Sequence, residues 1–123
     1  LLTKARDVMR TEDLPVVPPR MNLGGAVSQT SNGRLGQCIA VENGKVVGLI
    51  TDGDIRRAME SSRDRFFDLT VKDIMTKTPK TVPADTKITD IEDLLREYKI
   101  HSVLVTDEDG KLLGVVDSFS TMI

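Results

Sequence analysis

Residues 44–57 read GKVVGLITDGDIRR, in which an apolar run leads directly into a segment that can form a helix. The apolar run at 45–50 is typical of a β-strand, and apolar residues then recur at helical spacing from 52 to about 59. A second apolar run lies just upstream at 38–41, and the Glu-Asn-Gly at 42–44 between the runs contains the Asn-Gly pair that favours a tight hairpin. Residues 38–59 therefore predict two paired strands followed by a helix.

The same pattern occurs again about 66 residues later. Gly44–Gly48 is matched by Gly110–Gly114, an offset of 114 − 48 = 66, and Arg6–Met9 is matched by Lys72–Met75, an offset of 75 − 9 = 66. Each copy also contains a short strand that ends at a proline, at Val16-Val17 in the first copy and at Thr81-Val82 in the second. A nearly constant offset indicates two copies of one supersecondary unit.

The helix that follows this short strand is better defined in the second copy. We expect Asp85 or Thr86 to cap it. In the first copy, the corresponding segment at 22–32 contains Gly24 and Gly25, each of which costs about 1 kcal/mol relative to alanine in a helix interior, so a weaker helix is expected there. The apolar positions of the second helix are Ile88, Ile91, Leu94, Leu95 and Tyr98, and the strands expected after it are 102–106 and 111–116, joined by a turn at 107–110.

The order strand, helix, strand, strand, helix, written twice, predicts an α/β (α+β) fold. It consists of two βαββα repeats, which are too small to be stable alone and are expected to share a core with approximate two-fold symmetry. The expected organisation is a first repeat at 1–60, a connecting segment at 61–70, and a second repeat at 71–123 whose last helix is truncated or absent. Because the chain starts at Leu1 rather than Met, we expect it to be part of a longer protein.

Composition excludes several classes of function. Seventeen basic and nineteen acidic residues give a net charge of -2, which argues against a nucleic-acid-binding protein. No apolar run approaches the roughly 18 to 20 residues of a membrane-spanning helix, and no signal peptide is visible, so we expect a cytoplasmic protein without membrane contact. The single cysteine, Cys38, excludes an internal disulfide and is expected to be a small buried hydrophobic residue. A lone histidine, His101, excludes a Cys/His zinc site, and neither a metal nor a catalytic nucleophile with its base is predicted.

The junction at Thr51–Asp54 is the best candidate for a binding site. A strand ends at Thr51 and a helix begins within two residues, so the Thr51 hydroxyl and the free N–H groups of the first turn can converge on a phosphate. Gly53 permits close approach of a ligand, and the Asp54 carboxylate can accept hydrogen bonds from a ribose diol. Taken singly, the same residues also fit a purely structural role, with Thr51 or Asp52 as N-cap and Asp54 favoured by the helix dipole. The adjacent Arg56-Arg57 fits either a phosphate contact or a solvated helix face.

These features together resemble a known family. The doubled strand-helix-strand-strand-helix pattern, the Asp-apolar-Met near each start and the Gly-apolar-apolar-Thr-x-x-Asp of Gly48–Asp54 look like a pair of cystathionine-β-synthase (CBS) domains, or Bateman module. The similarity covers nearly the whole chain. More narrowly, Phe67–Met75 and Thr51–Arg57 resemble the C-terminal region of KpsF/GutQ-type arabinose-5-phosphate isomerases, which act in the synthesis of Kdo for lipopolysaccharide or capsule. The sugar isomerase (SIS) domain that carries the catalysis in such proteins is absent from this chain, so no isomerase activity is expected of it.

The resemblance implies roles for individual residues. Thr51 would contact a ligand phosphate and Asp54 a ribose, while Val17 and residues Ile39, Ala40 and Val41 would line a base pocket. His101 lies where CBS pairs can face the cleft between repeats, although a partly exposed structural histidine is the simpler interpretation. In the second copy, Asp117 and Ser120 stand where Thr and Asp are expected. Since a carboxylate would repel an anion, we expect the second cleft to be degenerate.

Two functions follow from the resemblance. In the first, the chain regulates an attached N-terminal SIS domain by binding AMP, ADP, ATP, S-adenosylmethionine or, by analogy with the pathway, CMP-Kdo or a sugar phosphate. In the second, it is a structural module that forms a homodimer and binds no small ligand; CBS pairs commonly associate through the helices after the third strand, here 52–59 and the segment after 117. A self-contained enzyme is the least supported alternative.

Overall fold

The computed structural model describes residues 2–33 and 35–118, and it divides the chain into two compact units. The central unit comprises residues 15–78, and the split unit combines the N-terminal segment up to residue 14 with the residues from 79 onward. Each unit contains one three-stranded sheet, as the two predicted repeats require. The last helix expected for the second repeat falls on 119–123, outside the described residues.

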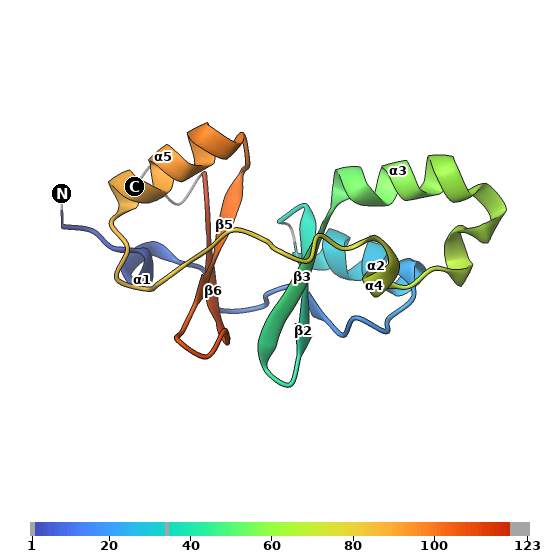
Figure 1. Ribbon diagram of the computed structural model, residues 1–123, viewed down its shortest axis with the longest axis horizontal. Helices are drawn as coiled ribbons and strands as arrows, with labels where there is room; N and C mark the ends of the chain where they lie inside the picture. Colours follow the sequence, from blue (N-terminus) through green and yellow to red (C-terminus); the bar gives the residue numbers. More distant parts are fainter. Residues whose placement is uncertain (1, 34, 119–123) are drawn as a thin grey trace. The chain divides into compact units, whose positions relative to one another are not determined.

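The central unit follows the predicted order of elements (Figure 1). Strand β1 pairs in parallel with β2, and β2 pairs antiparallel with β3, giving the sheet order β1-β2-β3. Helix α3 runs three residues beyond its predicted end at 59 and is followed by a 3₁₀-helix. The elements are β1 (Val16–Val17), α2 (Leu23–Gly33), β2 (Gln37–Glu42), β3 (Lys45–Thr51), α3 (Asp52–Ser62), η1 (Arg63–Asp68) and α4 (Val71–Ile74).

The hairpin between β2 and β3 turns at Asn43-Gly44, as predicted. Both residues have positive φ, 54° for Asn43 and 80° for Gly44, which is the backbone of a two-residue primed turn. Asn and Gly adopt this conformation at the lowest cost, so the sequence signal and the observed turn have the same physical origin.

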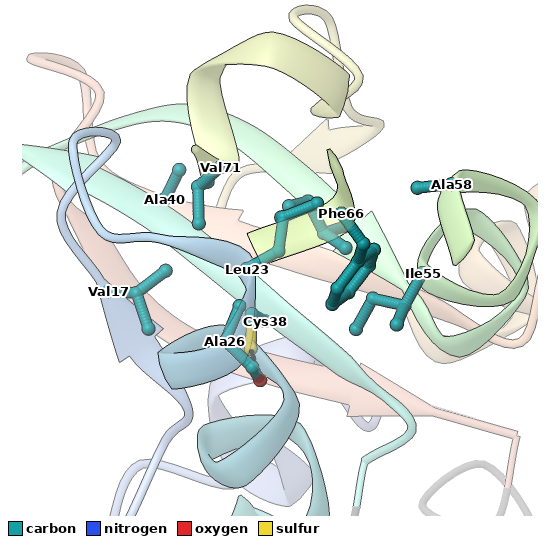
Figure 2. Close-up of a cluster of buried hydrophobic side chains, with 10 residues drawn as sticks. Val17, Leu23, Ala26, Cys38, Ala40, Ile55, Ala58, Phe66 and Val71 are labelled. Carbon is teal, nitrogen blue, oxygen red and sulfur yellow. Dashed lines mark hydrogen bonds between the residues drawn. The ribbon is translucent and has the colours of Figure 1, made fainter. Parts of the chain in front are cut away.

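The core of the central unit lies between its sheet and its helices (Figure 2). Figure 2 shows Cys38 of β2 beside Ala26 of α2 and Ala40 beside Val71 of α4, and Ile55 and Ala58 add the inner face of α3. Phe66, from the segment expected to be a polar connection, is only 2% exposed, and Figure 2 shows its ring beside Ile55. The 3₁₀-helix therefore contributes a large side chain to this core.

The split unit repeats the topology of the central unit. Its strands have the order β4-β5-β6, with β4 parallel and β6 antiparallel to β5, and α5 buries Ile91 and Leu95 on its inner face. Figure 1 shows α5 alongside β5. The elements are α1 (Ala5–Val8), β4 (Thr81–Val82), α5 (Ile88–Tyr98), β5 (Ser102–Thr106) and β6 (Leu112–Asp117).

The prediction that Asp85 or Thr86 caps α5 is wrong. The N-cap residue is Lys87, and no side chain caps it. Instead, the N–H of Ile88 donates to the carbonyl of Thr3 at 3.0 Å, so the N-terminal segment satisfies part of this helix end with its backbone. A partner about 85 residues away in sequence could not be recognised from local pattern.

The N-terminal segment of the chain is an integral part of the split unit. Ala5 is fully buried, its N–H donates to Thr86 at 2.8 Å, and Arg10 exchanges two backbone hydrogen bonds with Val115 at 2.8 and 2.9 Å. Helix α4 is held in the central unit in the same way, since Thr76 exchanges two such bonds with Leu49. The short helix that opens each repeat thus packs in the unit built mainly from the other repeat. The repeat boundaries expected from the sequence stay a prediction.

Among the residues that the structure describes, no helix has both the length and the apolar character needed to span a bilayer.

Candidate functional site

The N-terminus of α3 brings Thr51 and Asp54 into direct contact. The Thr51 hydroxyl oxygen accepts a hydrogen bond from the Asp54 N–H at 3.1 Å, and the Asp54 carboxylate accepts one from the Thr51 N–H at 3.0 Å. This reciprocal pair is a capping box, which satisfies two of the donors left free at a helix start. The structural role considered for these residues is therefore real, and any ligand role must be compatible with it.

The Thr51 hydroxyl keeps its own proton available. Within residues 2–33 and 35–118, that proton has no acceptor, so the hydroxyl can still donate to a ligand oxygen. The N–H of Asp52 is already used, since it donates to the carbonyl of Gly36 at 2.9 Å. The site thus offers one free hydroxyl at the start of an eleven-residue helix.

Arg57 completes this cluster. Its Nη2 lies 2.6 Å from the Asp54 carboxylate, and a Cβ built on Gly53 would lie 3.1 Å from Arg57 Nη1, so the guanidinium extends over Gly53. The Arg57 side chain is 66% exposed against 22% for Asp54. Sequence reasoning left Arg57 open as a solvated residue. The signal that could have decided it is the Asp54–Arg57 spacing of three, which places opposite charges on one helix face.

The four residues expected to line a base pocket do not share one face of the sheet. Val17 and Ala40 both belong to the buried core of the central unit. Side chains alternate along a strand, so Ile39 and Val41 lie on the opposite face of β2, with Ile39 fully buried and Val41 half-buried. Of the four, Ile39 and Val41 are the pair that the strand places together away from the helices.

The second copy of the motif has the same backbone frame with different side chains. Asp117 pairs with Ser102 at the end of β6, and the N–H of Ser118 donates to the carbonyl of His101 at 2.9 Å. This hydrogen bond is the counterpart of the one from Asp52 to Gly36 in the first copy. The His101 side chain is exposed. Ser120 lies outside the described residues, so degeneracy of the second site stays a prediction that rests on Asp117.

Cys38 is buried, as predicted. Its Sγ lies 2.7 Å from Thr30 Oγ1 and 3.2 Å from the carbonyl oxygen of Ala26. Burial raises the pKa of the Cys38 thiol above 9.0, and the carboxylate of Asp52 raises it further, while the hydrogen bond with Thr30 opposes them. A protonated thiol that is enclosed in this way packs as a small apolar group and is a poor nucleophile.

Comparison with curated proteins gives several arabinose 5-phosphate isomerases. The chain is 37% identical over 117 residues to a probable arabinose 5-phosphate isomerase of Haemophilus influenzae, a match that covers 95% of this chain and 34% of that protein. It is 33% identical over 120 residues to the arabinose 5-phosphate isomerase KpsF of Escherichia coli, covering 97% of this chain and 36% of that protein. The chain therefore spans about a third of the length of these relatives, and the resemblance noted from its motifs is confirmed.

Solved structures agree on the fold. The protein CBSX2 of Arabidopsis thaliana, solved in complex with AMP, superposes with a TM-score of 0.83 at 24% identity, covering 97% of this chain and 92% of that one. The CBS domain pair of protein MJ0100, solved with 5′-methylthioadenosine and S-adenosyl-L-methionine, superposes with a TM-score of 0.86 at 22% identity, covering 99% and 94%.

The family model for the CBS domain matches this chain twice, at residues 5–61 and 71–119. These two matches cover most of the chain and follow the internal repeat read from the sequence. The chain is a tandem pair of domains that belongs to the CBS domain family.

Proposed function

We propose that this chain is the regulatory region of a KpsF/GutQ-like arabinose-5-phosphate isomerase and binds a nucleotide or nucleotide-sugar beside Thr51 and Asp54. The relatives named above support the parent activity, and their length leaves room for a catalytic domain outside this chain. In this proposal an attached N-terminal SIS domain performs the aldose-ketose isomerisation, and the CBS pair changes its activity. Sugar phosphates are cytoplasmic metabolites, so we place the protein in the cytoplasm.

The observation that carries the proposal is the arrangement of Thr51, Gly53, Asp54 and Arg57 at the start of α3. A phosphate there would accept a hydrogen bond from the Thr51 hydroxyl and gain from the positive end of the helix dipole, and the Arg57 guanidinium would add a cation within reach. The Asp54 carboxylate can accept a hydrogen bond from a ribose hydroxyl, because the capping box does not use all of its lone pairs. A regulatory effect also requires that the ligand bind two states of the protein with different affinity.

The ligand class proposed is an adenine nucleotide, AMP, ADP or ATP. S-adenosylmethionine and CMP-Kdo are the alternatives. Support comes from the solved CBS pairs, one of which holds AMP and another S-adenosyl-L-methionine.

The second candidate, an assembly module that forms a homodimer, is favoured by a different observation. Met59 on α3 is 43% exposed and Phe67 in the adjacent 3₁₀-helix is 70% exposed. Large apolar side chains at this exposure are common at protein interfaces. Met59 lies on the helix that we expected to mediate dimerisation, and Phe67 lies in the 3₁₀-helix that follows it.

The test is a thermal-shift and calorimetric titration of the chain with AMP, ADP, ATP, S-adenosylmethionine, CMP and CMP-Kdo. A ligand at 100 times its dissociation constant adds about 2.7 kcal/mol to the free energy of unfolding, which raises the melting temperature by several degrees in a domain of this size. We expect Thr51→Ser, which keeps the hydroxyl, to retain this shift and Thr51→Val and Asp54→Asn to lose it.

A matched control comes from the other capping box in the central unit. At the start of α4 the Thr70 hydroxyl donates to the Asp73 carboxylate at 3.1 Å, so Thr70→Val removes a threonine–aspartate hydrogen bond at the same spacing of three, at a place with no proposed ligand contact. It should leave the ligand-induced shift unchanged. If none of the ligands shifts a well-folded parent chain, the regulatory proposal fails. Sedimentation of the parent and of Phe67→Ser then tests the assembly module, which predicts a dimer that this substitution weakens.

A further inference from the structure

The split unit contains a cavity that neither copy of the Gly-Thr-Asp motif accounts for. It is largely open to solvent and has a volume of about 530 Å³, within the range of roughly 300–1,000 Å³ that is typical of small-molecule sites. It lies at the carboxyl end of β4 and β5, where Thr81 and Thr106 line it. His101 and Asp117 mark the opposite end of the same sheet, about 13 Å away for four residue steps along an extended strand. The cavity is therefore separate from the second motif.

The polar lining consists of hydroxyl groups and unpaired charges. Thr81 and Thr106 provide two hydroxyls, Asp85 and Glu108 two carboxylates, and Arg6 of α1 one guanidinium. Within residues 2–33 and 35–118, none of these three charged side chains has a hydrogen bond or an ion pair. The cavity thus offers acceptors, donors and groups that can serve as both, without an internal network that a ligand would have to break.

The remaining lining residues are either apolar or already hydrogen-bonded within the protein. Val82, Pro83 and Leu113 form an apolar surface, with Leu113 37% exposed. Asp107 accepts hydrogen bonds from the N–H groups of Asp109 and Lys111 with one carboxylate oxygen, both at 2.9 Å, so its main role is to hold the hairpin turn.

Charge and donor pattern narrow the class of ligand. A phosphate dianion would gain one guanidinium and face the carboxylates of Asp85, Asp107 and Glu108, which is unfavourable. A simple cation would leave the apolar surface and the Arg6 donors unused. A molecule with several hydroxyls and a C–H face satisfies both kinds of lining, because hydroxyls donate to carboxylates and accept from guanidinium. We propose that this cavity binds a neutral polyhydroxylated small molecule of monosaccharide size.

Such a ligand would join two segments that are far apart in sequence. The N–H of Arg6 donates to the carbonyl of Ala84 at 2.9 Å, and both residues line the cavity. A bound molecule therefore contacts the N-terminal segment and the end of β4 together. Binding would stabilise the docked position of α1 and slow hydrogen exchange at the Arg6 amide.

The experiment is an NMR titration of the chain with D-arabinose, D-glucose and myo-inositol, with D-glucose 6-phosphate and tetramethylammonium as charged comparisons. We expect saturable shifts for the neutral polyols at the amides of Arg6, 81–82, 84–85, 106–108 and Leu113, with Thr51 and Asp54 unaffected. The absence of saturation by any neutral polyol at about 100 mM would overturn the proposal. So would tighter binding of the phosphate, or equal binding of tetramethylammonium.

Charge-neutralising variants test the two carboxylates. Asp85→Asn with Glu108→Gln removes two charge-assisted hydrogen bonds and should weaken binding about tenfold or more. The matched control is Asp90→Asn with Asp109→Asn, which makes the same change in charge at exposed carboxylates outside the lining, one of them in the same hairpin. Equal weakening in both double variants would show that net charge alone is responsible and would overturn the assignment. Nucleotide binding at Thr51 is tested with different ligands, so a negative result for the polyol cavity does not contradict the proposed nucleotide site, and the reverse also holds.

Discussion

Met75 lies directly against Gly48. A Cβ built on Gly48 would be 2.7 Å from Met75 Cγ, closer than real Cβ atoms approach another heavy atom, and 3.1 Å from Met75 Cβ, which is a tight contact. The split unit repeats the relationship, because a Cβ on Gly114 would lie 2.8 Å from Met9 Sδ and 2.8 Å from the carbonyl oxygen of Arg10. In each unit, the methionine that follows a short helix packs directly over a glycine of a strand. Met75 after α4 covers Gly48 of β3, and Met9 after α1 covers Gly114 of β6.

Gly48→Ala should destabilise the central unit. The added methyl group overpacks the contact with Met75, at a cost of about 1–3 kcal/mol in the free energy of unfolding. Met75→Ala in the same chain should recover part of that loss, since the side chain beyond Cβ is removed. Urea denaturation of the two single variants and the double variant measures the coupling, which we expect to be at least about 0.5 kcal/mol in favour of the double variant. Additive losses would show that the two residues do not press on one another.

The destabilisation caused by Gly114→Ala should be harder to relieve with a second substitution than that caused by Gly48→Ala. Here the added methyl group meets a backbone carbonyl, that of Arg10, as well as the flexible Met9 side chain. Shortening Met9 to alanine therefore removes only one of the two clashes. Thermal unfolding of the Met9→Ala, Gly114→Ala double variant is expected to show less recovery than the corresponding pair in the central unit. Full recovery would mean that the N-terminal segment moves freely enough to relieve the backbone contact.

Thr51→Val should destabilise the chain even without ligand. The substitution removes the hydroxyl that accepts from the Asp54 N–H, and loss of such a cap costs roughly 0.5–2 kcal/mol. Thr51→Ser keeps the cap and should stay within about 0.5 kcal/mol of the parent. Chemical denaturation checks both values, and any ligand titration of Thr51→Val has to be corrected for this loss. Equal stability of the valine and serine variants would contradict the capping role.

The Cys38 thiol should make stability depend on alkaline pH. Burial raises its pKa in the folded chain above 9.0, so the folded state keeps the proton when the unfolded state releases it. The unfolded state then binds fewer protons, and the free energy of unfolding falls as pH rises from about 9 toward the raised value. Denaturation of the parent and of Cys38→Ala between pH 7 and 10 should give curves whose difference shrinks above pH 9. Parallel curves would show that the thiol titrates equally in both states.

Phe66→Ala and Phe67→Ala should differ strongly although the residues are neighbours. Phe66 is 2% exposed in the core of the central unit, and removing its ring should cost about 3–5 kcal/mol. Phe67 is 70% exposed and touches Phe66 edge-on, with ring centroids 5.1 Å apart, so its loss should cost about 1 kcal/mol or less. Thermal unfolding of the two variants makes the comparison. Similar losses would contradict the burial of Phe66.

The internal repeat and the turn chemistry of this sequence were sufficient to predict the order of the strands and of helices α2, α3 and α5, but not the short elements α1, η1 and α4. The hairpin at Asn43-Gly44 could be placed because only residues that tolerate positive φ fit a two-residue primed turn. The amphipathic helix from Ile88 to Tyr98 could be placed because its apolar residues repeat at the helical period. The contact between Thr51 and Asp54 could also be predicted, because two residues three positions apart at a helix start are close together whatever the rest of the chain does.

Tertiary structure decided what depends on distant partners. Local pattern treats Phe66 and Phe67 alike, and only packing against Ile55 selects the first for the core. Local pattern also proposed a side-chain cap for α5, whereas the backbone of Thr3 supplies the acceptor. The docking of α1 beside β6 and the cavity lined by Arg6 depend on segments far apart in sequence, since Arg10 bonds Val115 (115 − 10 = 105 residues) and Arg6 bonds Ala84 (84 − 6 = 78 residues). Sequence periodicity reports the face that an element buries, but not which remote segment covers it, because that choice is made by shape and backbone hydrogen bonding in the folded state.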